Sequence, residues 1–219
     1  VEIPLSHNSK GIDALVRNII KYKVHTFLGY NMRFIPALIY LKKILLTKKY
    51  GTIYSIHSEV GSNLEFWRKN KEYQKSVSAK KNLGGGVLLE LSHEIDYLYW
   101  VFGAFKEVSS YVSKQSKLQI NTEDSAMINF ILKKNNIIGS LNIDFIRNDP
   151  TRICKVICEK GTLSCDLFNN NVYVFKKKSS KWLKLYNMPN ADSHYLQWIQ
   201  FLKNIKKNKF NIEDIKNGK

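Results

Sequence analysis

The first quarter of the chain changes from a strand-like pattern of apolar residues to a helical pattern and back. Residues 23–30 alternate between apolar and polar side chains, which predicts a strand that ends at Gly29. Pro36 stands where the first turn of a helix tolerates proline, and apolar residues follow at helical spacing up to a stop at Gly51. Residues 52–60 alternate again and predict a second strand.

A polar stretch and an unusually apolar helix follow. Residues 61–83 show little periodicity, so we expect an ordered excursion or lid there. Three consecutive glycines, Gly84 to Gly86, precede a helix that the spacing predicts over residues 87–102, with Gly103 as its stop. Because this helix is apolar on most of its surface, we expect most of its surface to be buried.

From residue 106 the pattern changes to strands joined by short turns, which makes neighbouring strands mostly antiparallel. Asn135 and Asn136 tolerate the positive φ of a tight hairpin turn. A terminal helix with one apolar face follows a predicted N-cap at Asp192 or Ser193. Strands are predicted at residues 107–113, 124–133, 137–145, 152–159, 161–167, 172–176 and 182–186.

This order of elements predicts the fold class. A strand and helices come first, then a long meander of strands, then a closing helix. Such an order is typical of an α+β domain with one open, mostly antiparallel sheet and helices packed on one face. The other face of the sheet would then meet solvent or another subunit.

The composition is that of a folded chain with a large positive charge. Hydrophobic residues make up 44% of the 219 residues, which argues against disorder, and no apolar run has the roughly 18 residues of a membrane span. The net charge of +17 raises the question of nucleic-acid binding. Only five of the 35 basic residues are arginine, however, the residue that reads bases and grips phosphates. We therefore expect no specific nucleic acid and no membrane as partners.

The three cysteines give no metal or disulfide signature. Cys154, Cys158 and Cys165 lack the paired spacing of a zinc site, and their number is odd. Cys154 and Cys158 would share one face of a strand, where free cysteine acts as a small apolar residue. We expect no metal site and reduced core cysteines, as in a cytoplasmic protein.

The best candidate for chemistry is the glycine-rich start of the apolar helix. Gly84 to Gly86 let a backbone approach a ligand closely, and the free amides of the following helix suit a polar or anionic group. Glu90 and Asp96 each stand three residues from His93, a spacing that places neighbours on one helix face. A histidine between carboxylates can act as a general acid or base. The alternative is a hydrogen-bonded core histidine, with glycines that only turn the chain.

The same segment resembles the substrate-site signature of the Gfo/Idh/MocA family of oxidoreductases, which includes glucose–fructose oxidoreductase and inositol 2-dehydrogenase. Gly84 to Gly86 followed by His93-x-x-Asp96 is the main similarity. Three further stretches agree in order and spacing, so the resemblance extends from Glu2 to about Phe145. They are Glu2-x-Pro4-Leu5, Gly29-Tyr30-Asn31-x-Arg33-Phe34-x-Pro36, and the strand start Gly51-x-Ile53.

The resemblance implies hydride transfer between NAD or NADP and a hydroxyl of a sugar or nucleotide-sugar. It implies a catalytic role for His93, with Glu90 as a weaker match because many members place an Asp four residues before the histidine. It also implies a homo-oligomer formed through the sheet face. Substrate binding would involve Asn31, Arg33, Trp67 and Arg68, and cofactor binding would involve Glu2 and Pro4.

The resemblance also implies two domains. Residues 1–22 would be the remnant of the end of a Rossmann-type domain. Residues 23–219 would be the domain for substrate binding and oligomerisation, clipped at its C-terminus.

Two departures from the family pattern set further expectations. The chain contains no strand–GxGxxG–helix unit, and Ile3 stands where the family has its catalytic lysine. We therefore expect a truncated oxidoreductase that is inactive alone. The alternatives are a non-catalytic module for sugar binding or assembly, and a basic protein associated with nucleic acid.

Overall fold

The computed structural model describes residues 1–8, 10–67, 72–187 and 191–208. Short 3₁₀ turns at Asn31–Phe34 and throughout the predicted lid connect the longer elements. The helices of the described residues are α1 (Ile12–Tyr22), α2 (Pro36–Leu46), α3 (Val87–Glu90), α4 (Ser92–Phe102) and α5 (Ser193–Lys206).

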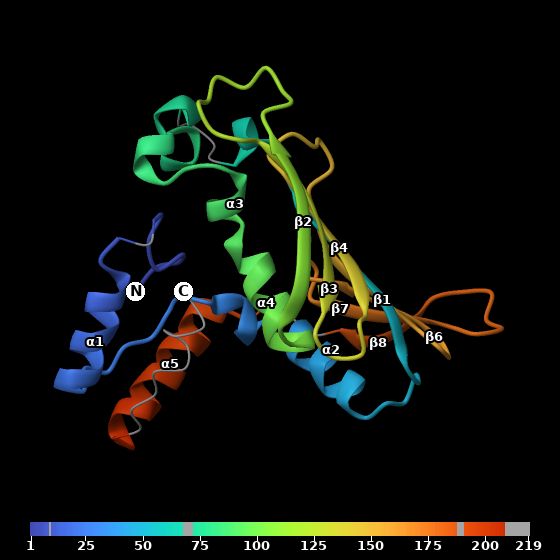
Figure 1. Ribbon diagram of the computed structural model, residues 1–219. Coiled ribbons are helices and arrows are strands. Elements are labelled where there is room, and N and C mark those ends of the chain that lie inside the picture. Colours follow the sequence, from blue (N-terminus) through green and yellow to red (C-terminus); the bar gives the residue numbers. More distant parts are fainter. Residues whose placement is uncertain (9, 68–71, 188–190, 209–219) are drawn as a thin grey trace.

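One open sheet dominates the structure (Figure 1). Its strand order is β2-β3-β4-β1-β5-β6-β7-β8; β1 pairs with β4 in parallel, and the other neighbouring pairs are antiparallel. Each strand lies within two residues of its predicted bounds. The strands are β1 (Ile53–Gly61), β2 (Phe105–Ser113), β3 (Ser125–Leu132), β4 (Ile138–Asp144), β5 (Thr151–Cys158), β6 (Gly161–Asp166), β7 (Asn171–Lys176) and β8 (Leu183–Asn187).

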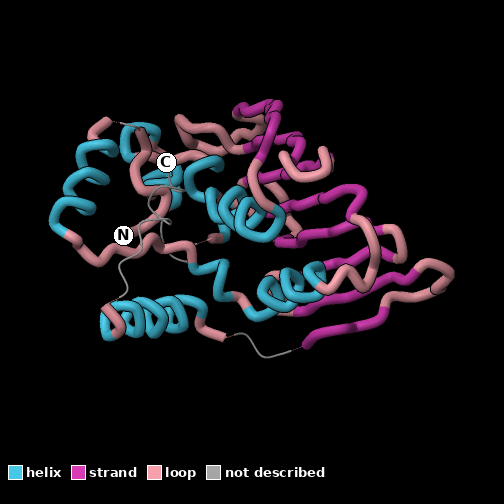
Figure 2. The backbone as a smooth tube through the Cα atoms, turned by 60° about the horizontal axis from the view of Figure 1, so that its bottom comes forward, coloured by secondary structure: helices cyan, strands magenta, loops and turns pink. Residues whose placement is uncertain are grey.

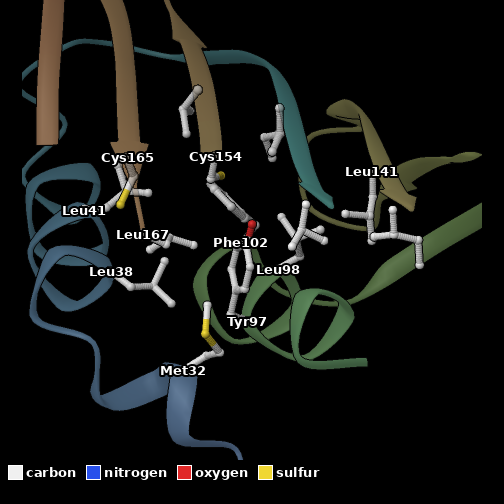
Figure 3. Close-up of a cluster of buried hydrophobic side chains, with 14 of the residues drawn as sticks. Met32, Leu38, Leu41, Tyr97, Leu98, Phe102, Leu141, Cys154, Cys165 and Leu167 are labelled. Carbon is white, nitrogen blue, oxygen red and sulfur yellow. The ribbon is translucent and has the colours of Figure 1, made fainter. Parts of the chain in front are cut away.

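The hydrophobic core lies between this sheet and the helices on one of its faces (Figure 2). Tyr97 and Leu98 of α4 and Leu41 of α2 meet buried strand residues such as Leu141 and Cys154 (Figure 3). All three cysteines are free and buried, as predicted. The sheet and its single helical layer confirm the predicted fold class, an open, mostly antiparallel sheet with helices on one face.

A second, smaller cluster joins the first thirty residues. Val16 and Ile19 of α1, a helix that the sequence analysis did not predict, pack with Leu28 and Tyr30. The amino group of Val1 donates to the Phe27 carbonyl (2.9 Å), and the Gly29 amide donates to the Val1 carbonyl (2.8 Å). These two bonds lie on either side of Leu28, the pattern of a parallel strand pair. Helix α1 connects the two paired segments, the chain start and residues 27–29.

Two predicted elements are wrong in part. Residues 23–30 form no strand, because a strand needs a hydrogen-bonding partner along its length and, among the described residues, only Val1 pairs with this segment as a neighbouring strand would. The helix predicted over residues 87–102 is two helices, α3 and α4, interrupted at Leu91 with φ −104° and ψ 22°. The turn at Asn135 and Asn136 has the predicted positive φ at both residues.

Candidate functional site

The first two turns of α4 carry three titratable residues, His93, Glu94 and Asp96, at the centre of the candidate site. Tyr97 and Leu98, which follow in the same helix, are almost completely buried against the sheet. Packing on the rigid sheet therefore fixes the position of this part of the helix. Glu90, at the end of α3, lies on the other side of the break at Leu91, so the continuous helix face predicted for Glu90 and His93 is interrupted.

Glu94 anchors α4 to β5. Its side chain is 0% exposed, and its Oε1 accepts hydrogen bonds from Nε (2.8 Å) and Nη2 of Arg152. Burial raises the pKa of Glu94, and the Arg152 guanidinium opposes that shift. A buried carboxylate without a cation would be strongly unfavourable, so this ion pair is required for α4 to seat as it does.

A second ion pair fixes α4 from the other side. Nε and Nη2 of Arg33 donate to the two carboxylate oxygens of Asp96 at 2.9 and 2.6 Å, a bidentate geometry. The Arg33 guanidinium also stacks over the Tyr30 ring, 4.9 Å from its centre. Arg33, predicted to bind substrate, therefore lies at the site with its charge paired to the aspartate of the His-x-x-Asp motif.

His93 belongs to the part of α4 that these two ion pairs hold, and its side chain is mostly buried. Burial lowers its pKa to about 4, and the positive charges of Arg152 and His194 add to that effect. The imidazole is therefore neutral at pH 7. Its Nδ1 atom is buried and has no hydrogen-bond partner among the described residues. A neutral histidine with a free nitrogen can accept a proton from a hydroxyl group.

Asn31 connects this site to the C-terminal helix. Its Nδ2 atom donates to Ser193 Oγ (3.0 Å) and lies 3.1 Å from His194 Nε2. Gln197 of the same helix donates to the Leu28 carbonyl (3.1 Å). Asn31, predicted to bind substrate, therefore lies against the start of α5, in the same 3₁₀ turn as Arg33.

The three glycines serve the packing of the chain. A Cβ on Gly85 would lie 2.1 Å from the Val77 carbonyl oxygen, and one on Gly86 would lie 2.2 Å from the Glu123 carboxylate. The amides at the start of α3 are also occupied, since Leu88 donates to Glu123 Oε1 (3.3 Å). The expectation that glycines and amides receive a ligand is therefore wrong, because chain segments that are distant in sequence fill that space.

Two further predicted residues come from the lid. Trp67 donates from Nε1 to the Ser62 carbonyl (3.1 Å), and its ring packs edge-on against Phe145 with 4.9 Å between centres. Its indole therefore contacts the hydrophobic core. Arg68 lies outside the described residues.

The residues predicted to bind cofactor lie at the chain start. Glu2 lines a cavity of about 450 Å³, which also includes Val1, His25, Thr26, Phe27, Gly29, His194, Gln197, Trp198 and Phe201. Pro4 follows a cis peptide bond. The Ile3 side chain packs against the small cluster that α1 forms with Leu28 and Tyr30, so the residue at the position of the family's lysine belongs to this apolar packing.

Arg152, Glu94 and His194 were not predicted as site residues. His194 is 163 residues from its partner Asn31, and Arg152 is 58 residues from Glu94. Sequence spacing gives no signal for pairs so far apart. The described residues contain no group of three or more metal-ligating side chains suited to a metal ion. They also contain no helix with the length and apolar character that crossing a membrane requires.

Dehydrogenases and a putative oxidoreductase are among the solved structures with the same fold. Levoglucosan dehydrogenase in complex with NADH matches with a TM-score of 0.82 and 17% identity, over 99% of this chain and 66% of that one. A putative oxidoreductase from Thermotoga maritima matches with a TM-score of 0.77 and 18% identity, over 100% of this chain and 66% of that one. UDP-N-acetylglucosamine 3-dehydrogenase from Acidithiobacillus ferrooxidans matches with a TM-score of 0.75 and 17% identity, over 99% of this chain and 64% of that one.

The chain thus spans slightly less than two thirds of these relatives, and at such low identity they establish its fold. No curated protein sequence matches the chain. The model of the GFO/IDH/MocA C-terminal domain matches residues 38–164, which is more than half of the chain. That segment includes most of α2, the lid, α4 with His93, and β5 with Arg152. The chain belongs to the GFO/IDH/MocA C-terminal domain family.

Proposed function

We propose that this chain is the substrate-binding part of an NAD(P)-dependent oxidoreductase that acts on a sugar or a nucleotide-sugar. The observation that carries the proposal is the state of His93. It is neutral at pH 7, has an unpartnered buried nitrogen, and lies on a helix turn held by two ion pairs. Rigid support of this kind is what a proton-accepting residue needs in order to meet a hydroxyl in one geometry.

In this proposal His93 accepts the proton of the hydroxyl that is oxidised, and Asn31 contacts a neighbouring hydroxyl through its buried Oδ1 atom. Arg33 positions the site through Asp96. Glu90, at the end of α3 and on the other side of the helix break, assists His93. Two of the neighbouring structures are dehydrogenases named for levoglucosan and UDP-N-acetylglucosamine, and these two compounds define the substrate class that we propose.

In the proposal, the described residues hold only part of a dinucleotide site. A Rossmann-type site uses a glycine-rich turn between a strand and a helix, and the 219 residues contain no GxGxxG sequence. In the proposal, Glu2 and Pro4 contribute one edge of a site for NAD or NADP, and residues 1–22 are the end of a Rossmann-type domain. When bound, the nicotinamide would accept the hydride from the sugar carbon.

The position of Ile3 supports the expectation that the chain is inactive alone. Its side chain packs against the small cluster that α1 forms with Leu28 and Tyr30, and it has no group that could move a proton. The same observation favours the second candidate, a sugar-binding module without catalysis. The three free, buried cysteines are in keeping with a cytoplasmic location, which we also propose.

Calorimetric titration tests the proposed function. We expect the purified chain to bind at least one of levoglucosan, N-acetylglucosamine and UDP-N-acetylglucosamine, and the variant H93A to bind it about tenfold more weakly, as for a lost hydrogen bond in a buried site. H57A, on the opposite face of the sheet, is the matched control. With NAD⁺ and the bound sugar, the wild-type chain should form no NADH. Binding of duplex DNA without binding of any sugar would contradict the proposal.

We also propose that two copies associate through the uncovered sheet face. Tyr111 (79% exposed), Met127 (59%) and Ile138 (60%) belong to β2, β3 and β4 on that face. Tyr111 lies opposite Met127 in the antiparallel register, so these side chains form one surface. Exposed apolar side chains gathered on a flat sheet are typical of an interface.

Sedimentation velocity tests the association. We expect an oligomeric wild-type chain and a monomeric M127E variant, because the new carboxylate would be buried without a partner in the interface. L46E is the control, since Leu46 is 74% exposed at the end of α2 on the helical side. A monomeric wild-type chain, or an M127E variant that associates like wild type, would refute the proposed interface.

A further inference from the structure

The start of α5 holds His194 in a fixed place. Asp192 caps the helix, and its Oδ1 atom accepts hydrogen bonds from the amides of His194 and Tyr195, both at 3.0 Å. This cap orders the first turn, so the backbone of His194 is positioned independently of any ligand. The side chain is nevertheless exposed and lines the cavity that also includes Glu2.

Contact with Asn31 determines which nitrogen of His194 is free. The Asn31 amide donates one hydrogen to Ser193 Oγ (3.0 Å) and has a second for His194 Nε2 (3.1 Å). His194 Nε2 is then an acceptor, and a neutral imidazole that accepts at Nε2 carries its proton at Nδ1. That N–H group has no partner among the described residues, so it is a donor available to a ligand.

The surrounding residues have unused hydrogen-bonding capacity. Asn31 Oδ1, Ser92 Oγ and His93 Nδ1 are buried and have no partner among the described residues. Buried polar atoms are normally satisfied, so unpartnered ones at the start of α4 and in the 3₁₀ turn of Asn31 indicate a place that a polar molecule fills. His194 is near enough to His93 for its charge to lower the pKa of that residue. A molecule with several adjacent hydroxyl groups matches this mixture of donors and acceptors.

We propose that His194 is a substrate-contacting residue that closes the His93 site from the side of α5 and donates a hydrogen bond from Nδ1 to a sugar hydroxyl. The inference rests on the proposed function and extends it, because it assigns the C-terminal helix to the binding site. His93 and His194 would then contact neighbouring hydroxyls of one sugar ring, with Asn31 between them.

A pair of isosteric variants tests this contact. The glutamine amide in H194Q can replace Nε2 as the acceptor from Asn31 but offers no donor at the place of Nδ1. The asparagine amide in H194N offers a donor at the place of Nδ1 but cannot replace Nε2 against Asn31. We expect H194Q to bind UDP-N-acetylglucosamine, or whichever of the three sugar probes the wild-type chain binds, about three- to tenfold more weakly. H194N should retain most of the affinity. The histidine NMR signals of His93 and His194 should shift together during the titration.

The possible results separate the contact from the proposed function. If H194Q binds like wild type while the His93 signal still shifts, the contact is refuted and the proposed function stands. If no sugar probe binds the wild-type chain, both are refuted. A second measurement needs no ligand: H194A should raise the pKa of His93, because the positive charge that His194 carries when both of its nitrogens are protonated is removed. An unchanged pKa would place His194 away from His93 and would also overturn the proposal.

Discussion

Replacing Arg152 with methionine should lower the free energy of unfolding by about 3–5 kcal/mol, the usual cost of leaving one member of a buried ion pair alone. Glu94 is 0% exposed, and both of its hydrogen bonds from charged groups come from Arg152. Methionine has a similar length, so the variant removes the charge with little loss of volume. Urea unfolding followed by circular dichroism measures the effect.

Two further variants control for this result. In E94L/R152M neither charge remains, so most of the lost stability should return. In K75M the ion pair with Glu72 is broken at the surface, where both side chains are more than 60% exposed, and the change should be small. A loss of less than about 1 kcal/mol in R152M would mean that Glu94 is solvated or protonated in the folded chain.

Lowering the pH from 7 to 5 should cost the folded chain about 2 kcal/mol through His93 alone. The pKa of His93 is about 4 in the folded chain and 6.5 as its ordinary value. The unfolded chain therefore binds a proton in a pH range where the folded chain does not. Stability from this group is complete above pH 6.5 and is lost as the pH falls toward 4.

The measurement is urea unfolding of wild type and H93Q at both pH values. The difference between the two chains isolates His93 from the carboxylates, which titrate in the same range. H93Q should lose about 2 kcal/mol less than wild type between pH 7 and pH 5. H57Q leaves His93 in place and should retain the full dependence of the wild-type chain. Equal pH dependence in wild type and H93Q would show that His93 is solvated and not held neutral by burial.

Local pattern was sufficient to predict the strands of the sheet, though not the place of β1 between β4 and β5. In β5, for example, Cys154, Val156 and Cys158 are buried while the residues between them are more exposed, so the alternation in the sequence reports the buried face directly. The hairpin at Asn135 and Asn136 and the cap at Asp192 were predictable for a related reason. Each depends on a few consecutive residues with a specific backbone or hydrogen-bonding role.

The site could be predicted only in part, because distant residues complete it. The pattern indicated His93 and Asp96, but it could not indicate that Arg33, 63 residues from Asp96, neutralises that aspartate. Nor could the glycines be interpreted from their neighbours, since Glu123 fills the space beside Gly86. Residues 23–30 failed as a strand for the same reason: alternation predicts a strand only where a partner is present to pair with it.

The most direct test of the proposed substrate site is a crystal structure of the chain with UDP-N-acetylglucosamine or levoglucosan, whichever binds. We expect the sugar ring to lie against His93 at the start of α4, with Asn31 on one side and the α3–α4 break on the other. A ligand bound at the uncovered sheet face, or at any surface remote from α4, would contradict the assignment of His93 as the centre of the substrate site.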